Sequence, residues 1–150
     1  LYYLETGNYL STFHLTDANN VYAGAKISYD YKDVFGISVG GKYYNWDADD
    51  EVALITKPQF RIDFQTNFRP IPALDVKLGY EYIKREEVRS LNADYLRDPI
   101  SNLSLGATYR LFNDLSVYVS ASNLLNKDYH YYIGYPSQGI NFLGGLSFKF

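Results

Sequence analysis

Residues 59–68 read Gln59-Phe60-Arg61-Ile62-Asp63-Phe64-Gln65-Thr66-Asn67-Phe68. Every second side chain is apolar, with one threonine among them, and the side chains between are polar or charged. Alternation with a period of two predicts a β-strand that has one apolar face and one wet face. The segment therefore predicts a sheet, not a helix, in the middle of the chain.

The same period continues through most of the sequence. Apolar and polar residues alternate in the further segments 21–31, 35–43, 74–82, 103–111, 115–121 and 140–150. Between them, the short connections 32–34, 69–73 and 112–114 keep the apolar residues of consecutive strands on one face. We predict an all-β fold in which seven to eight meandering strands form one continuous antiparallel sheet.

The predicted connections differ in length between the two ends of this sheet. The connections 47–56, 86–99 and 126–139 are long and polar, and only 16–20 is short at that end. Short turns at one end and long loops at the other are typical of outer-membrane barrels, whose short turns face the periplasm. Phe150 falls at the short-turn end, where such a barrel finishes.

Charge is confined to one face of the predicted strands. The charged residues on the polar face are Lys26, Asp30, Lys42, Arg61, Asp63, Asp75, Lys77, Glu81, Arg110 and Lys149. A Lys or Arg facing lipid at the bilayer midplane costs about 2–4 kcal/mol, so a membrane would enforce this segregation. Aromatic residues gather near the strand ends, as membrane interfaces favour: Tyr29, Tyr31, Phe35, Phe68, Phe148 and Phe150 at one end, Tyr43, Tyr80 and Tyr82 at the other. We therefore expect an antiparallel transmembrane β-barrel, integral to a bacterial outer membrane.

Composition excludes several other classes of protein. The chain has no Cys and no Met, so thiolate sites and disulfides are absent, and its net charge of -3 with no basic run does not suggest nucleic acid. The mean hydropathy of -0.28 does not exclude a membrane barrel, because alternating apolar and polar residues cancel in the average. His14 and His130 are the only histidines, and no Gly-x-Ser-x-Gly pattern accompanies them. We expect neither an enzyme nor a cofactor.

Three groups of residues are candidate sites. Asp47, Asp49, Asp50 and Glu51 cluster as Ca²⁺ ligands do, although a solvated turn is the preferred interpretation. The loop residues Tyr129, His130, Tyr131 and Tyr135, together with Tyr132, are candidates to face a ligand; anchoring at the membrane interface is the preferred alternative. The polar-face residues Arg61, Asp63, Asp75, Lys77 and Glu81 are expected to form a cross-strand charge ladder or to contact a plug.

The carboxyl end contains two distinctive motifs. They are Ser122-Asn123-Leu124-Leu125-Asn126-Lys127-Asp128-Tyr129 and Gly134-Tyr135-Pro136-Ser137-Gln138-Gly139, followed by the strand Phe142-Leu143-Gly144-Gly145-Leu146-Ser147-Phe148-Lys149-Phe150. These elements resemble the carboxyl end of TonB-dependent receptors, the Bacteroidetes-type members above all. Upstream, Asp17-Ala18-Asn19-Asn20 and Thr56-Lys57-Pro58-Gln59-Phe60 fit the same family more loosely. The resemblance therefore covers essentially the whole chain.

This resemblance implies an outer-membrane receptor of about 22 strands, closed around a plug, that imports a bulky nutrient. Residues 1–150 would supply the last seven or eight strands, without the plug. The implied partners are outer-membrane lipid, the remainder of the barrel and plug, the barrel-assembly machinery and, indirectly, the TonB complex. Gly145, Phe148 and Phe150 resemble the family's assembly signal, although Leu143 replaces its usual polar residue. The two phenylalanines are alternatively interface residues only.

Two other architectures remain open at this point. If residues 1–15 form a single strand, the chain is a complete eight-stranded outer-membrane barrel with a structural, adhesive or binding role. A soluble lipocalin-like calyx, with its apolar face inward, is the third. Strand order distinguishes the receptor segment from the complete eight-stranded barrel, because the last strand of a complete barrel pairs with its first strand. The transported ligand cannot be named from these residues.

Overall fold

A computed structural model describes residues 2–6, 11–15, 17–50, 54, 56–85, 98–132 and 135–149. Within residues 2–6 and 11–15, and at residue 132, only the backbone is described. The described chain is all-β, as the alternation predicts. Its strands are β1 Tyr2–Thr6, β2 Ser11–Leu15, β3 Ala18–Tyr31, β4 Phe35–Ala48, β5 Pro58–Ile71, β6 Leu74–Arg85, β7 Ile100–Arg110, β8 Leu115–Ser122, β9 His130–Tyr132, β10 Tyr135–Pro136 and β11 Asn141–Phe148.

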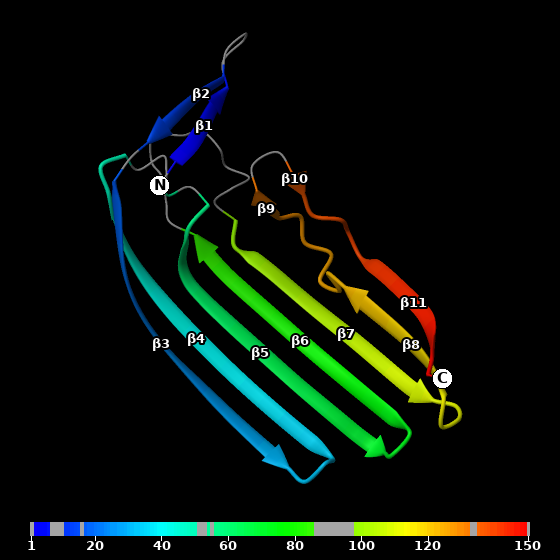
Figure 1. Ribbon diagram of the computed structural model, residues 1–150. Coiled ribbons are helices and arrows are strands. Elements are labelled where there is room, and N and C mark those ends of the chain that lie inside the picture. Colours follow the sequence, from blue (N-terminus) through cyan, green and yellow to red (C-terminus); the bar gives the residue numbers. More distant parts are fainter. Residues whose placement is uncertain are drawn as a thin grey trace.

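Seven of these strands form one antiparallel sheet in the order β11-β8-β7-β6-β5-β4-β3 (Figure 1). The predicted meander is confirmed, because each long strand pairs with the long strand before and after it in the chain. The short turns lie together at the lower end in Figure 1, and the strand ends that are joined by longer connections lie at the upper end. We call these the turn end and the loop end.

The register keeps like residues together across the whole sheet. On one face Ile27 pairs with Val39 and Val39 with Phe64. Farther along the sheet, Phe64 pairs with Tyr80 on that face. On the other face, Asp63 pairs with Glu81, and Glu81 with Asn102. A slip of one residue would exchange the two faces, so the alternation itself specifies this register.

Two of the three short connections differ from the prediction. Residues 32–34 form the β3–β4 turn as expected. The loop predicted at 69–73 is wrong, because β5 continues to Ile71 and only Pro72 and Ala73 turn the chain. A register shift between Phe68 and Ile71 makes room for the extra strand residues. The β7–β8 connection is 111–114, one residue longer than predicted, because Leu111 lies in the turn.

The sheet has two open edges in the described part of the chain. β3 pairs only with β4, and β11 pairs only with β8. The hypothetical single strand over residues 1–15 is not observed, because β1 and β2 pair with each other as a separate hairpin. The strand order of a complete eight-stranded barrel is therefore not seen.

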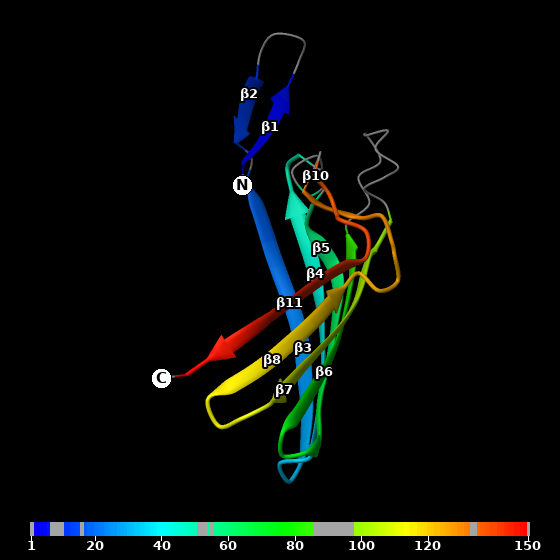
Figure 2. The ribbon, with the colours of Figure 1, turned by 90° about the vertical axis from the view of Figure 1, so that its right-hand side faces the viewer.

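The polar face of the sheet is the hollowed one. A hollow of about 720 Å³ crosses β5 to β8 on this face, with Asn67, Lys77, Ser104 and Ser120 in its lining. The side view shows the sheet twisting and curling toward β8 and β11 (Figure 2). The opposite, convex face is apolar and uncovered in the described chain; Ile27 is 77% exposed and Leu146 is 70% exposed. No helix among the described residues is long and apolar enough to cross a membrane.

Candidate functional site on the concave face

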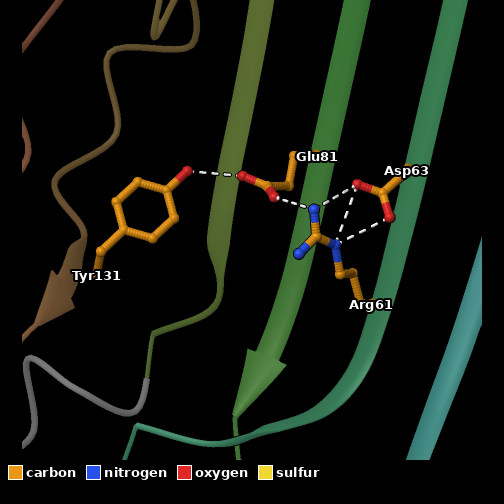
Figure 3. A network of polar contacts seen from close by, with 4 residues as sticks. All are labelled: Arg61, Asp63, Glu81 and Tyr131. Carbon is orange, nitrogen blue, oxygen red and sulfur yellow. Dashed lines mark hydrogen bonds and ion pairs between the residues drawn. The ribbon is translucent and has the colours of Figure 1, made fainter.

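A network of charged groups lies on the concave face toward the loop end of β5 and β6 (Figure 3). Asp63 and Glu81 are direct cross-strand partners, which places two carboxylates side by side. Arg61 lies between them: its Nη2 is 2.9 Å from Asp63 Oδ1 and 2.8 Å from Glu81 Oε1. Its Nε also donates to Asp63 Oδ2 at 2.9 Å. The guanidinium therefore offsets the repulsion between the carboxylates with charge-assisted hydrogen bonds.

Tyr131 joins this network from the long loop that contains β9 and β10. Its hydroxyl donates to Glu81 Oε2 at 2.6 Å, across 50 positions of sequence (Figure 3). Burial and the hydrogen bond to the Glu81 carboxylate both raise the pKa of Tyr131, so the phenol stays a donor. The Tyr129 ring meets Tyr131 edge to face, with centroids 5.4 Å apart, and Tyr129 itself is buried. The loop is thereby fastened to the concave face.

Asn123 organises the start of this loop. It follows β8 with a left-handed backbone (φ 51°) and is 2% exposed. Its side-chain amide donates to the carbonyls of Lys127 and Gln138, at 2.9 and 2.8 Å, and its oxygen accepts from the Lys127 amide at 3.1 Å. Its own backbone amide donates to Asn102 Oδ1. Asn tolerates this backbone better than other non-glycine residues, and its amide satisfies three buried backbone groups at once.

The two motifs at the carboxyl end meet in space. Ser137 donates its backbone amide to the Tyr129 carbonyl at 2.7 Å, and its hydroxyl accepts from the Tyr129 amide at 3.3 Å. Gln138 supplies one of the carbonyls that Asn123 binds. Gly139 lies close to Asn126, whose Oδ1 would be 3.2 Å from an added Cβ. The motifs that resemble TonB-dependent receptors thus form one packed unit.

The predicted charge ladder is only partly assembled. Arg61, Asp63 and Glu81 come together as described above. Asp75 instead pairs with Arg69 at 2.7 Å, nearer the turn end. Lys77 lines the hollow between β5 and β8 and has no ion pair in the described chain. The ladder is therefore one triad and one separate pair.

The aromatic loop residues have different environments. Tyr129 is 4% exposed and belongs to the packed loop. Tyr131 is turned toward the concave face, not outward as interface anchoring would require. Tyr135 is 75% exposed and remains accessible. His130 is half-buried, with its Nδ1 inside the loop.

The other predicted residues lie apart from the network. Asp47 and Asp49 are exposed near the end of β4, Asp50 is half-buried, and Glu51 lies outside the described residues. No group of three or more potential metal ligands occurs among the described residues. The side chain of His14 lies outside the described part of the chain.

The residues of the resembled assembly signal lie on the edge strand β11. Gly145 pairs with Tyr118, whose ring lies over it: an added Cβ would be 2.5 Å from the tyrosine hydroxyl. The glycine therefore has a packing role of its own. Phe148 is 63% exposed on the convex face, and Phe150 lies outside the described residues.

Sequence reasoning missed two features of the concave face. The first is the role of Asn123, which the sequence shows only as part of a motif. Asn123 and Asn126 lie three residues apart at the end of a strand, and Asn is a residue type that tolerates left-handed turns. The aromatic residues Tyr22, Tyr44 and Trp46 lie on the polar face, against the general pattern. Their even positions in β3 and β4, opposite in phase to Tyr29 and Tyr43, were the available signal.

A scan against models of known protein families finds no match, and a search of curated proteins finds no similar sequence. The geometry of the concave face indicates the kind of ligand that it could bind. Its polar hollows, paired charges and fastened loop suit the binding of a polar ligand.

Proposed function

We propose that the chain is a wall segment of an outer-membrane β-barrel receptor of the TonB-dependent type, which imports a bulky nutrient. The observation that carries the proposal is the direction of curvature: the apolar face is convex and the polar face is concave. A small soluble barrel fills its interior with side chains, so a calyx would have its apolar face inside. A transmembrane barrel has an apolar exterior and a polar lumen. The curvature thus favours the membrane barrel over the lipocalin-like alternative.

The height of the apolar band supports the same proposal. On β4, the convex-face positions from Phe35 to Tyr43 carry no charge. This stretch is about 27 Å long at the rise of an antiparallel strand. At the tilt of about 35–45° found in outer-membrane barrels its height is roughly 19–22 Å, which fits within their apolar band of about 25 Å. Asp47 and Lys84 occupy positions of the same parity, but beyond the band at the loop end.

The open edges favour a larger barrel over the complete eight-stranded alternative. A transmembrane barrel has no unpaired edge, because lipid offers no hydrogen bonds to exposed backbone. β3 and β11 would therefore pair with further strands of the receptor. The carboxyl-terminal motifs support the TonB-dependent type. On this proposal the convex face contacts lipid, the concave face lines a lumen with the plug, and β11 is read by the assembly machinery.

Single cysteines on adjacent residues test the membrane assignment. The chain has no native Cys, so Val39→Cys and Ser38→Cys give labels on opposite faces of one strand without background. In proteoliposomes, a membrane-impermeant maleimide should label Ser38→Cys readily and Val39→Cys at least tenfold more slowly. Detergent should then expose Val39→Cys to the reagent.

Substitution by arginine at the same pair gives an energetic test. Val39→Arg should impair membrane insertion, because a lipid-facing arginine costs about 2–4 kcal/mol. Ser38→Arg is the matched control and should insert normally. If both cysteines react equally in liposomes and Val39→Arg inserts like the wild type, the convex face does not contact lipid and the proposal fails.

A further inference from the structure

An aromatic column stands on the concave face at the loop end of β3 and β4. Tyr22 and Tyr44 are cross-strand partners with ring centroids 5.9 Å apart. Trp46 continues the column, nearly parallel to Tyr44 at an interplanar angle of 18°. The indole is oriented by a hydrogen bond of 2.8 Å from its Nε1 to the Pro58 carbonyl. Tyr22 ends the column on the edge strand β3 and is 65% exposed in the described chain.

Two lysines follow this column on the same face, toward the turn end of β3 and β4. Lys42 pairs with Gly24, and Lys26 pairs with Gly40, so each lysine stands beside a glycine of the neighbouring strand. The Lys42 stem lies over Gly24, where an added Cβ would be 2.8 Å from its Cγ. Lys26 lies against Gly40 in the same way, at 3.9 Å. Because the glycines have no side chains, both lysine stems pack against their backbone.

Tyr22, the last ring of the column, and the two lysines line one hollow of about 480 Å³, which we call the Tyr22 hollow. Its charged lining residues are Lys26, Lys42, Arg61 and Asp63. Arg61 is already engaged by Asp63 and Glu81. Lys26 and Lys42 have no ion pair in the described chain, so their ammonium groups leave the hollow with uncompensated positive charge.

Interface anchoring does not account for these aromatics. Anchoring rings face the lipid headgroups from the outside of a barrel. The neighbouring residues Val21 and Tyr43 have the parity of the convex face, whereas Tyr22 lines the hollow and Tyr44, its cross-strand partner, lies on the same face. An exposed aromatic ring beside two lysines that have no ion pair in the described chain is instead suited to a flat, negatively charged molecule.

We propose that the Tyr22 hollow binds a flat aromatic ring that carries a carboxylate or a comparable anionic group. The ring lies on the exposed side of the Tyr22–Tyr44 column, and Lys26 and Lys42 bind the anion. This inference rests on the proposed function, because the concave face must line a water-filled lumen for such a ligand to reach it. It names a class of ligand for the proposed receptor.

Three probes separate the parts of this recognition. Binding of 2-naphthoate, 2-naphthamide and cyclohexanecarboxylate is measured by calorimetry on the intact, detergent-solubilised protein, with Trp46 fluorescence as a second readout. The naphthoate should bind at least tenfold more tightly than either control. The amide lacks the charge, and the cyclohexane acid lacks the flat ring.

Variants assign the two interactions to their residues. Lys42→Gln should weaken naphthoate at least fivefold and leave naphthamide unchanged, whereas Tyr22→Leu should weaken both. Lys32→Gln and Tyr29→Leu are matched controls, at the turn and on the convex face of β3, and should bind like the wild type. Equal affinity for the three probes, or no effect of Lys42→Gln and Tyr22→Leu, would overturn the inference.

The outcome is distinguishable from that of the membrane assignment. Protein that inserts with the expected cysteine labelling but does not prefer naphthoate contradicts only the ligand class. Protein that prefers naphthoate but labels equally at residues 38 and 39 contradicts the membrane barrel and leaves the hollow as a binding site.

Discussion

The two ends of the sheet are built in different ways. At the turn end the strands are joined by short connections, and large side chains remain exposed, among them Phe112 at 72%. The large buried side chains of the described residues all lie at the loop end: Leu54, Arg85, Ile100, Asn123 and Tyr129. The turn end is thus held by backbone hydrogen bonds between adjacent turns and strands, such as that from the Arg69 amide to the Val34 carbonyl. The loop end depends on buried side chains that join distant segments.

The same backbone conformation illustrates the difference. Lys32 at the turn end and Asn123 at the loop end have nearly identical φ values, 50° and 51°. The Lys32 ammonium reaches only the neighbouring Tyr31 ring, at 5.3 Å from its centroid. The Asn123 side chain binds three backbone groups on two segments. The left-handed residue therefore makes only local contacts at Lys32, whereas at Asn123 it joins distant segments of the chain.

The largest effect is expected from Asn123→Ala. It removes three part-buried hydrogen bonds at about 1 kcal/mol each and places an alanine in a left-handed conformation. We expect a loss of about 2–4 kcal/mol in the free energy of unfolding, measured with denaturant in detergent. Asn123→Gly, which accepts the backbone but lacks the amide, should lose about 1 kcal/mol less. A variant within about 0.5 kcal/mol of the wild type, roughly the error of such measurements, would remove the contrast between the two ends.

A smaller effect, dependent on pH, is expected from Tyr131→Phe. Loss of the hydrogen bond to Glu81 should cost about 1 kcal/mol at neutral pH, because the site is partly exposed. The pKa of Tyr131 is raised in the folded protein, so its contribution is complete below about pH 10, the ordinary tyrosine value. It is lost as the pH rises from there toward the folded-state pKa.

The measurement is the free energy of unfolding between about pH 8 and pH 11. The wild type should lose more stability than Tyr131→Phe over the upper part of this range. Tyr135→Phe is the control, since Tyr135 is 75% exposed, and it should follow the wild-type profile. Parallel profiles for all three proteins would mean that the loop is not fastened through this phenol.

The smallest effect is expected from Lys32→Gly at the turn end. Glycine relieves a left-handed conformation that costs other residues about 1–2 kcal/mol, but it removes the cation–π contact and adds freedom to the unfolded chain, each about 0.5–1 kcal/mol. These contributions nearly cancel, so the free energy of unfolding should stay within about 0.5 kcal/mol of the wild type. A clear loss, seen in the same denaturant titration, would show that the Lys32 side chain matters to the turn as Asn123 does to the loop.

The difference between the turn end and the loop end also explains which features the sequence predicted well. The alternation around Phe64 and Val76 is strictly local and has a period of two, so it predicted the strands, their order and both faces. The turn at Ile71 was misplaced because a register shift depends on how the two strands pair, which alternation does not report. The Asn123 contacts and the Tyr131–Glu81 bond join segments far apart in the chain, and no local pattern encodes them. The aromatic column was missed because its residues are informative only once Tyr22 and Tyr44 are known to be opposite each other.

The open edges of the sheet have a consequence for how the chain folds. Each long strand pairs only with its neighbours in sequence, so assembly needs no long-range search and can advance hairpin by hairpin with little loop-closure entropy. In the proposed receptor, the seam that closes the barrel is the one pairing between strands far apart in the chain. Until that seam forms, the β11 edge presents a row of unpaired amides and carbonyls that favours adhesion to other strands. Ring closure, rather than strand formation, is then the slow and aggregation-sensitive step of biogenesis.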